Sequence, residues 1–227
     1  MPVFDYIIVA VAAYLLGSIP TGFLVAKAKG IDIRSVGSGN IGATNAMRVL
    51  GKPAGIFVLL MDAAKGFFSV VILPNALVLF IFQVPNPDYL RSYQSFGEEP
   101  ITFQNKIQLI AGIFAVLGHN YTCWLKFKGG KGIATTAGVF LALAPWAVLV
   151  GLVVFILAVL LTKYVSVGSI AAAIALPVTV WMMTPQNIFL GIVSTALGAL
   201  AIYKHKSNIQ RLIAGTENRL GKKKDTK

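Results

Sequence analysis

Long apolar stretches separated by short polar segments form the dominant pattern along this chain. A helix needs about 20 consecutive apolar residues to cross the hydrocarbon core of a bilayer. The first stretch continues past Pro20 to Ala26 and is too long for a cleaved signal peptide, so we expect a retained first helix. Apolar stretches of sufficient length predict membrane-spanning helices at residues 4–26, 53–82, 107–124, 166–183 and 187–203.

The apolar stretch 132–163 is too long for one ordinary crossing, and Pro145 lies in its middle. Proline is best accommodated in the first turn of a helix, so we predict two helices, at 132–144 and 146–163. The first of these is short and needs tilt or shielding by its neighbours. The pattern therefore predicts an all-α polytopic membrane protein with seven transmembrane helices, one of them short.

The distribution of basic residues predicts the orientation of these helices, because short cytoplasmic loops are enriched in Lys and Arg. Seven crossings place on one side Lys27, Lys29, Arg34, Arg48, Lys52, Lys126, Lys128, Lys131, Lys163 and the tail from Lys204 onward. Six crossings would put that tail opposite the other basic loops. We therefore predict the N-terminus outside and the C-terminus in the cytoplasm, with a single domain over 1–227, an extracytoplasmic loop at 83–106 and a solvated basic tail at 216–227.

Composition agrees with a membrane protein and narrows the functional classes. Hydrophobic residues make up 56% of the chain and charged residues 12%, with a mean hydropathy of +0.76, which leaves too few polar side chains to cover a soluble globule. Topology accounts for the net charge of +12, so no nucleic-acid partner is predicted. Cys123 is the sole cysteine, which excludes an intramolecular disulfide. No metal site and no cofactor are predicted.

A glycine-rich polar segment at 37–48 is the first candidate site. Glycine allows backbone N–H groups to approach an oxyanion closely, and hydroxyl and amide side chains add further donors. An arginine at its end can bind phosphate through two hydrogen bonds. The residues concerned are Gly37, Ser38, Gly39, Asn40, Thr44, Asn45 and Arg48. The alternative is an ordinary flexible loop; the order of residues does not match a nucleotide-binding P-loop.

The second candidate is Gly129-Gly130-Lys131-Gly132, which opens the short predicted helix and includes Thr135 in its first turn. A helix N-terminus with a fixed lysine forms an anion site, so Lys131 is predicted to bind phosphate, with Gly130 beside it. Lys128 contributes either to this site or only to membrane topology. The third candidate is His205 with Asn208, three residues apart on one helical face. Its alternative is a polar cap at the membrane surface.

Charged residues at membrane depth form a further group. Asp62 and Lys65 are three residues apart inside a predicted span, where charges are functional candidates by default. A structural ion pair is the equally weighted alternative, and we expect a structural or supporting role for Asp62 and for His119. Together, Arg48, Lys65 and Lys131 predict a cytoplasm-facing basic pocket for two phosphate-bearing molecules. The apolar helices around it suit a long acyl chain.

Taken in order, these motifs resemble the bacterial membrane acyl-phosphate:glycerol-3-phosphate acyltransferases along the whole chain. The matching strings are 37–48, Asp62 with Lys65-Gly66, Gly118-His119, 128–135 and Tyr203-Lys204-His205 with Asn208. The resemblance implies a seven-helix enzyme of the bacterial plasma membrane that forms 1-acylglycerol 3-phosphate and inorganic phosphate from acyl phosphate and glycerol 3-phosphate. The loop at 83–106 departs from the family pattern. The His-x-x-x-x-Asp motif of other acyltransferases is missing, because Trp124 and Gln210 occupy the aspartate positions after His119 and His205.

Acyl phosphate is already activated, so we hypothesise direct transfer without an acyl-enzyme. Ser38, Lys131 and His205 are the predicted catalytic residues, and the base is His205 or the donor's own phosphate. The second is favoured because the sequence offers His205 no carboxylate partner. Membrane lipid and a soluble acyl-phosphate-producing enzyme are candidate partners. A transporter or flippase for an anionic phosphorylated solute or lipid is the alternative function. A non-enzymatic scaffold would leave the glycine-rich loops unexplained.

Overall fold

The computed structural model describes residues 3–80 and 103–220. Regular structure in these ranges is helical throughout: α1 (Val3–Ser18), α2 (Thr21–Lys27), α3 (Ala43–Leu50), α4 (Lys52–Val71), α5 (Leu73–Phe80), α7 (Phe103–Asn120), the 3-10 helix η2 (Cys123–Leu125), α8 (Ile133–Leu143), α9 (Pro145–Thr162), α10 (Val165–Met183), α11 (Ile188–Lys204) and α12 (Lys206–Ile213). Most of the predicted loop 83–106 and the end of the predicted tail, 221–227, lie outside the described residues.

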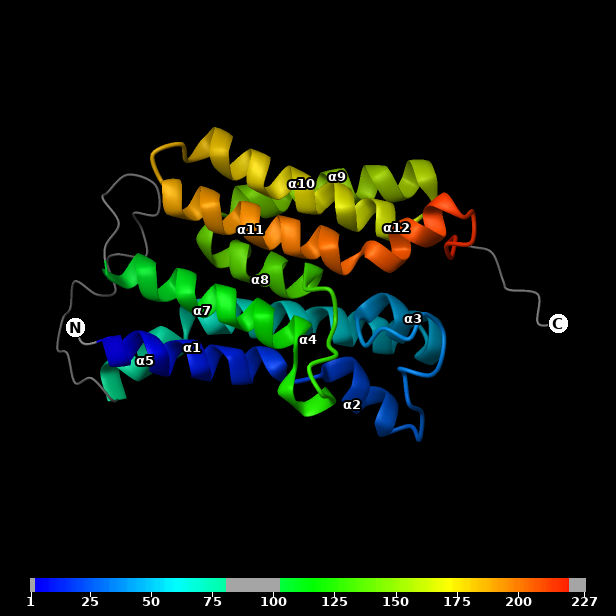
Figure 1. Ribbon diagram of the computed structural model, residues 1–227, viewed down its shortest axis with the longest axis horizontal. Helices are drawn as coiled ribbons and strands as arrows, with labels where there is room; N and C mark the ends of the chain where they lie inside the picture. Colours follow the sequence, from blue (N-terminus) through cyan, green and yellow to red (C-terminus); the bar gives the residue numbers. More distant parts are fainter. Residues whose placement is uncertain (1–2, 81–102, 221–227) are drawn as a thin grey trace.

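The long helices run along one common axis and alternate in direction (Figure 1). Within this bundle α1 packs on α7, α4 on α8, and α10 on both α9 and α11. The N-terminus lies at one end, whereas the short helices α2, α3 and α12 gather at the other (Figure 1). Among the described residues, the polar segments 28–42 and 121–132 therefore lie toward the end that carries α3 and α12, whereas the turn 184–187 lies at the other end.

Two prolines divide apolar stretches: the break at Pro145 was predicted, whereas residues 4–26 were predicted as one helix that continues past Pro20. Pro20 has no N–H to continue a helix, and α1 ends at Ser18 before α2 begins at Thr21. Pro145 occupies the first position of α9 and separates it from α8, as predicted. The stretch 53–82 is divided by Ile72 into α4 and α5. The short helices α3 and α12 were not predicted, because each lies in a polar segment whose apolar pattern is too brief.

Length and composition identify four helical stretches as candidate membrane spans among the described residues: Phe4–Lys27, α4, α9 and α10. A fifth is obtained if α11 and α12, which meet at an angle of 52°, are taken as one span. The short helix α8 has 11 residues, in agreement with the prediction of one short helix. An integral membrane protein with several spans is thus confirmed, whereas seven crossings and their orientation stay predictions.

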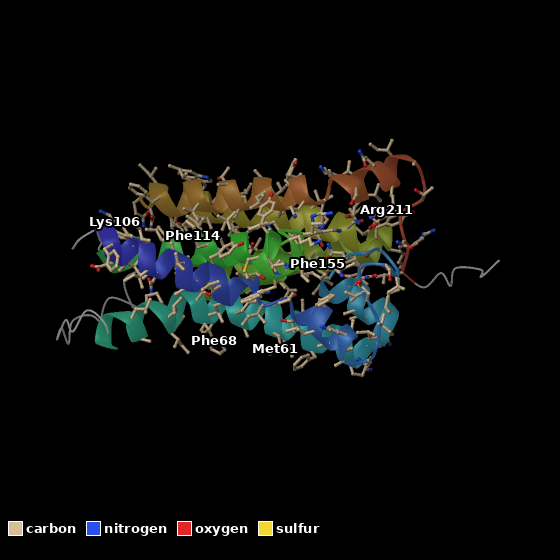
Figure 2. The ribbon with its side chains drawn as sticks, turned by 60° about the horizontal axis from the view of Figure 1, so that its bottom comes forward. Met61, Phe68, Lys106, Phe114, Phe155 and Arg211 are labelled. Atoms are coloured by element: carbon tan, nitrogen blue, oxygen red, sulfur yellow. The ribbon has the colours of Figure 1, made fainter. Side chains whose placement is uncertain are left out.

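Small residues allow the helices to approach closely. A Cβ added to Gly66 of α4 would lie 2.2 Å from the carbonyl oxygen of Thr135 in α8, and one added to Gly138 would lie 1.9 Å from that of Ala63. Such contacts replace hydrophobic driving force as the basis of helix association in lipid. The outer surface is apolar: Leu161 of α9 is 82% exposed, which suits a lipid environment. Figure 2 shows two further exposed apolar side chains, Met61 and Phe68, projecting from α4.

Candidate active site

A cavity lies toward the end of the bundle that carries α3 and α12, among α3, α4, α7, α8, α9, α10 and α12 and the segments that flank them. The predicted site residues that line it are Ser38, Asn40, Thr44, Asn45, Arg48, Asp62, His119, Lys131, His205 and Asn208. The remaining ones, which lie outside the lining, are Gly37, Gly39, Lys65, Lys128, Gly130 and Thr135. The structure therefore brings most of the three sequence motifs to one place.

The glycine-rich segment is organised by the amide of Asn45, which is 2% exposed. Its oxygen accepts a hydrogen bond from the N–H of Ser38 over 2.8 Å. Its nitrogen donates to the carbonyls of Ile33, Val36 and Asn40 over 3.2, 3.1 and 2.9 Å. The sequence predicted Asn45 as a substrate donor, but the structure uses both ends of its amide to shape the loop.

Two glycines of this segment adopt backbone conformations that other residues rarely take. Gly37 has a φ of +64° and Gly39 a φ of +70°. A Cβ added to Gly37 would also lie 2.2 Å from the Asn45 amide oxygen. These two glycines therefore hold the turn on which Ser38 faces the cavity, rather than lining the cavity themselves.

Positive potential at the cavity comes from helix termini as well as from side chains. Gly42 and Thr44, at the start of α3, line the cavity, and so do Gly132 and Ile133 at the start of α8. Unpaired N–H groups at a helix N-terminus attract anions. Arg48, which is exposed on α3, contributes its guanidinium to the same cavity.

Lys131 belongs to a chain of polar contacts that crosses from the second motif to the third. Its ammonium donates to the amide oxygen of Asn208. The Asn208 nitrogen donates to Glu217 over 2.7 Å, and Arg211 donates to the other Glu217 oxygen over 2.7 Å. Burial lowers the pKa of Lys131 to about 8, although the nearby Glu217 carboxylate acts in the opposite direction. Burial alone would raise the pKa of Glu217, but hydrogen bonds from Asn208 and Arg211 lower it overall.

His205 caps the end of α11 and is 3% exposed. Its Nδ1 lies 2.8 Å from the carbonyl oxygen of Ala201, so Nδ1 carries the proton and Nε2 is an acceptor. Burial, followed by the charge of Lys131, lowers the pKa of His205 to about 4. The imidazole is therefore neutral at physiological pH.

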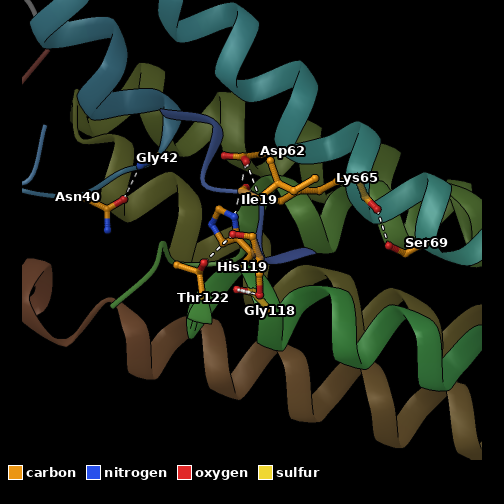
Figure 3. A network of polar contacts seen from close by, with 10 residues as sticks. Ile19, Asn40, Gly42, Asp62, Lys65, Ser69, Gly118, His119 and Thr122 are labelled. Atoms are coloured by element: carbon orange, nitrogen blue, oxygen red, sulfur yellow. Dashed lines mark hydrogen bonds and ion pairs between the residues drawn. The ribbon is translucent and has the colours of Figure 1, made fainter. Parts of the chain in front are cut away.

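Asp62, Lys65 and His119 form a buried network beneath the cavity (Figure 3). Lys65 Nζ lies 2.9 Å from an Asp62 oxygen and donates to the carbonyl of Ile19 over 3.0 Å, at the break between α1 and α2. His119 Nδ1 lies 3.6 Å from the same Asp62 oxygen. Lys65, which the sequence predicted as a phosphate ligand, is thus engaged within the protein, while Asp62 and His119 reach the cavity wall.

The other predicted residues of the second motif do not line the cavity. Gly130 packs so closely on His119 that an added Cβ would lie 2.1 Å from Nε2. Thr135 is fully buried at the crossing of α8 and α4, and its hydroxyl has no hydrogen-bond partner within the described parts of the chain. Lys128 is exposed and away from the cavity, which agrees with the alternative of a topology charge.

A family model described as glycerol-3-phosphate acyltransferase matches residues 7–215. The chain belongs to the glycerol-3-phosphate acyltransferase family. The family resemblance inferred from the sequence motifs is therefore confirmed. A member of this family from Geotalea daltonii is 42% identical over 213 residues, covering 93% of this chain and 96% of the relative. One from Clostridioides difficile is 42% identical over 226 residues, covering 99% and 100%.

Solved structures of the glycerol-3-phosphate acyltransferase family share the fold. A crystal structure of PlsY, an integral membrane glycerol 3-phosphate acyltransferase, in its glycerol 3-phosphate form matches with a TM-score of 0.77 at 37% identity, covering 95% of this chain and 96% of that one. The lysophosphatidic acid form of PlsY matches with a TM-score of 0.75 at 36% identity, covering 95% of both chains.

Some residues that line the cavity of this acyltransferase were not predicted from the sequence. The tail was predicted to be solvated from residue 216, yet Glu217 and Asn218 line the cavity, and the Glu217 side chain is 7% exposed. An acidic residue within a basic terminal segment was the one signal available. The apolar lining residues Leu59, Phe155 and Val165 carried no signal, because they are typical of any span.

The residues described by the structure contain no group of three or more His, Cys, Asp or Glu side chains arranged to hold a metal ion. The polar lining combines cations, amides, hydroxyls, imidazoles and helix N-termini with the two carboxylates of Asp62 and Glu217. Glu217 is hydrogen-bonded to Asn208 and Arg211, and Asp62 is paired with Lys65. The donors in this set are suited to phosphate oxygens.

Proposed function

We propose that the protein transfers a fatty acyl group from acyl phosphate to the 1-hydroxyl of glycerol 3-phosphate, giving 1-acylglycerol 3-phosphate and inorganic phosphate. The observation that carries this proposal is the meeting of Arg48, Lys131, His205 and Asn208 in one cavity. Family membership and the likeness to a glycerol 3-phosphate form of PlsY support the acceptor. The phosphate-binding character of the cavity supports a phosphorylated donor.

Charge is the main obstacle that such a reaction must overcome, because two phosphate groups of nearly −2 charge repel each other. The cations Arg48 and Lys131 and the N-termini of α3 and α8 all act on the same cavity. Positive groups held in place before binding can bring both anions together without reorganisation at the moment of reaction.

An acyl chain needs an apolar wall beside these polar groups. Leu59 of α4, Phe155 of α9 and Val165 of α10 line the cavity together with the phosphate-binding residues. Figure 2 labels Phe155 within the bundle, in contrast to Met61 and Phe68 on the outer side of α4. A cavity that is polar on one side and apolar on another suits a donor with a phosphate head and a fatty tail.

The chemistry that we propose is direct transfer. Ser38 donates to the donor phosphate or to the developing carbonyl oxyanion, and Lys131 and Arg48 hold the phosphates. His205 Nε2 and Asn208 orient glycerol 3-phosphate. An imidazole whose pKa is about 4 is a weaker base than a phosphate whose second pKa is about 6, so the departing phosphate takes the acceptor proton.

The orientation follows from the position of the cavity. It lies at the bundle end where the basic segments converge, and the positive-inside rule assigns such an end to the cytoplasm. We therefore place the protein in the bacterial plasma membrane with its N-terminus outside, seven crossings and a cytoplasm-facing site. A soluble acyl-phosphate-producing enzyme could deliver the donor from that side, and the product would enter the surrounding lipid.

The test is phosphate release and lysophosphatidate formation from palmitoyl phosphate by the purified protein in detergent, with and without glycerol 3-phosphate. We expect release that depends on the acceptor and that is lost in Lys131→Ala. Lys52→Ala is the matched control, because Lys52 is an exposed lysine at the start of α4 away from the cavity. A folded protein that binds glycerol 3-phosphate but forms no product would instead favour transport.

Two variants test the proposed steps. Ser38→Ala is expected to lower kcat by roughly 100-fold, the usual effect of removing one oxyanion or phosphate donor. Unchanged turnover in this variant would remove Ser38 from the mechanism. Rapid mixing should show no burst of acyl-enzyme, because direct transfer forms no covalent intermediate. A burst would refute direct transfer.

A further inference from the structure

The C-terminus of α7 is a junction between three separate parts of the site. The last four carbonyls of a helix have no partner within the helix and must find partners elsewhere. In α7 the Leu117 carbonyl accepts from Tyr121 N over 2.8 Å, and the Gly118 carbonyl accepts from Ser18 Oγ over 3.3 Å. The His119 carbonyl accepts from Gly130 N over 2.9 Å. The Asn120 carbonyl accepts from both Gly129 N, over 3.2 Å, and Lys204 Nζ, over 3.0 Å. The helix end thus joins α1, the segment that begins at Gly129 and carries Lys131, and the end of α11.

Lys204 is the contact that reaches this junction from α11. Its ammonium bonds to the Asn120 carbonyl and lies 4.4 Å from the centre of the Tyr121 ring. A cation at a helix C-terminus is stabilised by the helix dipole, and an aromatic face adds a cation–π contribution. Lys204 is only partly exposed, so its charge is directed at this junction rather than left in solvent.

The position of Lys204 in the chain gives this contact its importance. Lys204 directly precedes His205, and the carbonyl it binds also accepts from Gly129, two residues before Lys131. The contact therefore connects the end of α11, which His205 caps and after which α12 carries Asn208, with the segment carrying Lys131. It does so outside the cavity, since Lys204 does not contribute to the lining.

A second contact joins the two motifs directly inside the cavity, from Lys131 to Asn208. A phosphate that takes the Lys131 ammonium would compete for this contact. The bond from Lys204 to Asn120 uses neither group, so a phosphate at Lys131 does not compete for it. It ties the two elements indirectly, because the Asn120 carbonyl that accepts from Lys204 Nζ also accepts from Gly129 N.

We propose that Lys204 is a positioning residue, which holds His205 and Asn208 in register with Lys131 through the end of α7. The inference rests on the proposed acyl transfer, because it assigns the acceptor to one element and the phosphate-binding lysine to the other. Loss of the contact leaves each binding half intact and loosens their relative placement. A displacement of about 1 Å between reactants can cost about 100-fold in rate.

The test compares Lys204→Met, Lys204→Arg and Lys206→Met in detergent. Lys206 is the matched control, since it is an exposed neighbouring lysine that lies 5.1 Å over the Tyr203 ring and away from α7. We expect Lys204→Met to lower kcat by about 10- to 100-fold, with both KM values within about threefold and full stoichiometry of glycerol 3-phosphate binding. Lys204→Arg should restore kcat to within about threefold, because it returns a cationic donor.

Hydrogen exchange provides a measurement that is independent of activity. The amides of Gly129 and Gly130 bond to the end of α7 and should exchange faster in Lys204→Met than in Lys206→Met.

Should Lys204→Met fail to fold, Tyr121→Leu and Tyr121→Phe replace it. Tyr121→Leu removes the ring beneath the Lys204 ammonium and should slow turnover about threefold, whereas Tyr121→Phe keeps the ring and should keep activity.

Three outcomes would overturn the inference: equal kcat in Lys204→Met and Lys206→Met, a loss of binding stoichiometry in parallel with kcat, or no rescue by Lys204→Arg. If Lys204→Met does not fold, equal turnover in Tyr121→Leu and Tyr121→Phe would overturn it as well. Failure of the proposed function has a different signature, because wild-type protein would then form no lysophosphatidate. The exchange rates of Gly129 and Gly130 would still decide whether Lys204 holds the two elements together.

Discussion

The buried amide of Asn45 accepts a hydrogen bond from the backbone N–H of Ser38 over 2.8 Å, although seven residues separate them. The same amide donates to three carbonyls of the preceding loop. The position of the Ser38 hydroxyl at the cavity is therefore set by a side chain that is itself almost inaccessible. This relationship makes Asn45 the support of the predicted catalytic serine.

We expect Asn45→Ala to lower kcat at least about tenfold and to destabilise the protein by about 1–3 kcal/mol, because it leaves buried backbone groups unpaired. Steady-state kinetics and thermal unfolding measure the two effects. Asn187→Ala is the control, since Asn187 is also buried and caps α11 by accepting from Leu190 N over 3.0 Å, far from the cavity. It should lose stability and keep kcat; a similar loss of kcat in both variants would contradict a specific role for Asn45.

The pH dependence of kcat/KM should show an alkaline limb that reports Lys131. Its pKa is lowered to about 8, so the ammonium that binds phosphate loses its proton as the pH rises through that value. The carboxylate of Glu217 raises this pKa, so Glu217→Gln should move the limb to lower pH. Asp32→Asn is the control, because Asp32 pairs with Arg34 on the exposed loop before the cavity. A limb that does not move in Glu217→Gln would assign it to another group.

Gly130→Ala should impair the enzyme through a steric clash. The added Cβ would lie 2.1 Å from His119 Nε2, and both the imidazole and the adjoining Lys131 would have to shift. We expect kcat/KM to fall about 100-fold by steady-state assay. Gly151→Ala in α9 adds the same methyl group where the nearest atom outside its own helix, Ala172 O, is 3.8 Å away, and it should keep full activity. Equal activities in these two variants would show that the His119 side chain can move to accommodate the added methyl group.

Breaking the buried pair of Asp62 and Lys65 should cost more than replacing it. Lys65→Met leaves a buried carboxylate uncompensated and is expected to destabilise the protein by about 3–5 kcal/mol. The double variant Asp62→Asn with Lys65→Met should recover most of that loss. Denaturation in detergent measures both, and additive losses in the double variant would argue against a coupled pair. Because Asp62 also lines the cavity, recovery of stability should exceed recovery of activity.

The sequence predicts most of the fold because the relevant physics is local. Apolar stretches long enough for a bilayer locate the long helices, and Pro145 marks a predicted break, since a residue without an N–H cannot continue a helix. The break at Pro20, inside the predicted helix 4–26, was not predicted. Glycine-rich polar segments are equally visible, as they interrupt an otherwise apolar chain. Their gathering at one end of the bundle follows from alternating helix direction (Figure 1).

The tertiary structure decided which polar groups remain available for substrate. Asn45 and Lys65 are engaged within the protein, whereas Glu217 joins the cavity from a segment predicted to be solvated. Likewise, Lys204 contacts Asn120 across 84 positions of sequence. Periodicity and composition describe neighbours along one helix, but a side chain's partner depends on distances between segments that only the folded bundle brings together. The residue types of the site are therefore determined by the sequence, and their division into ligands and supports by the packing.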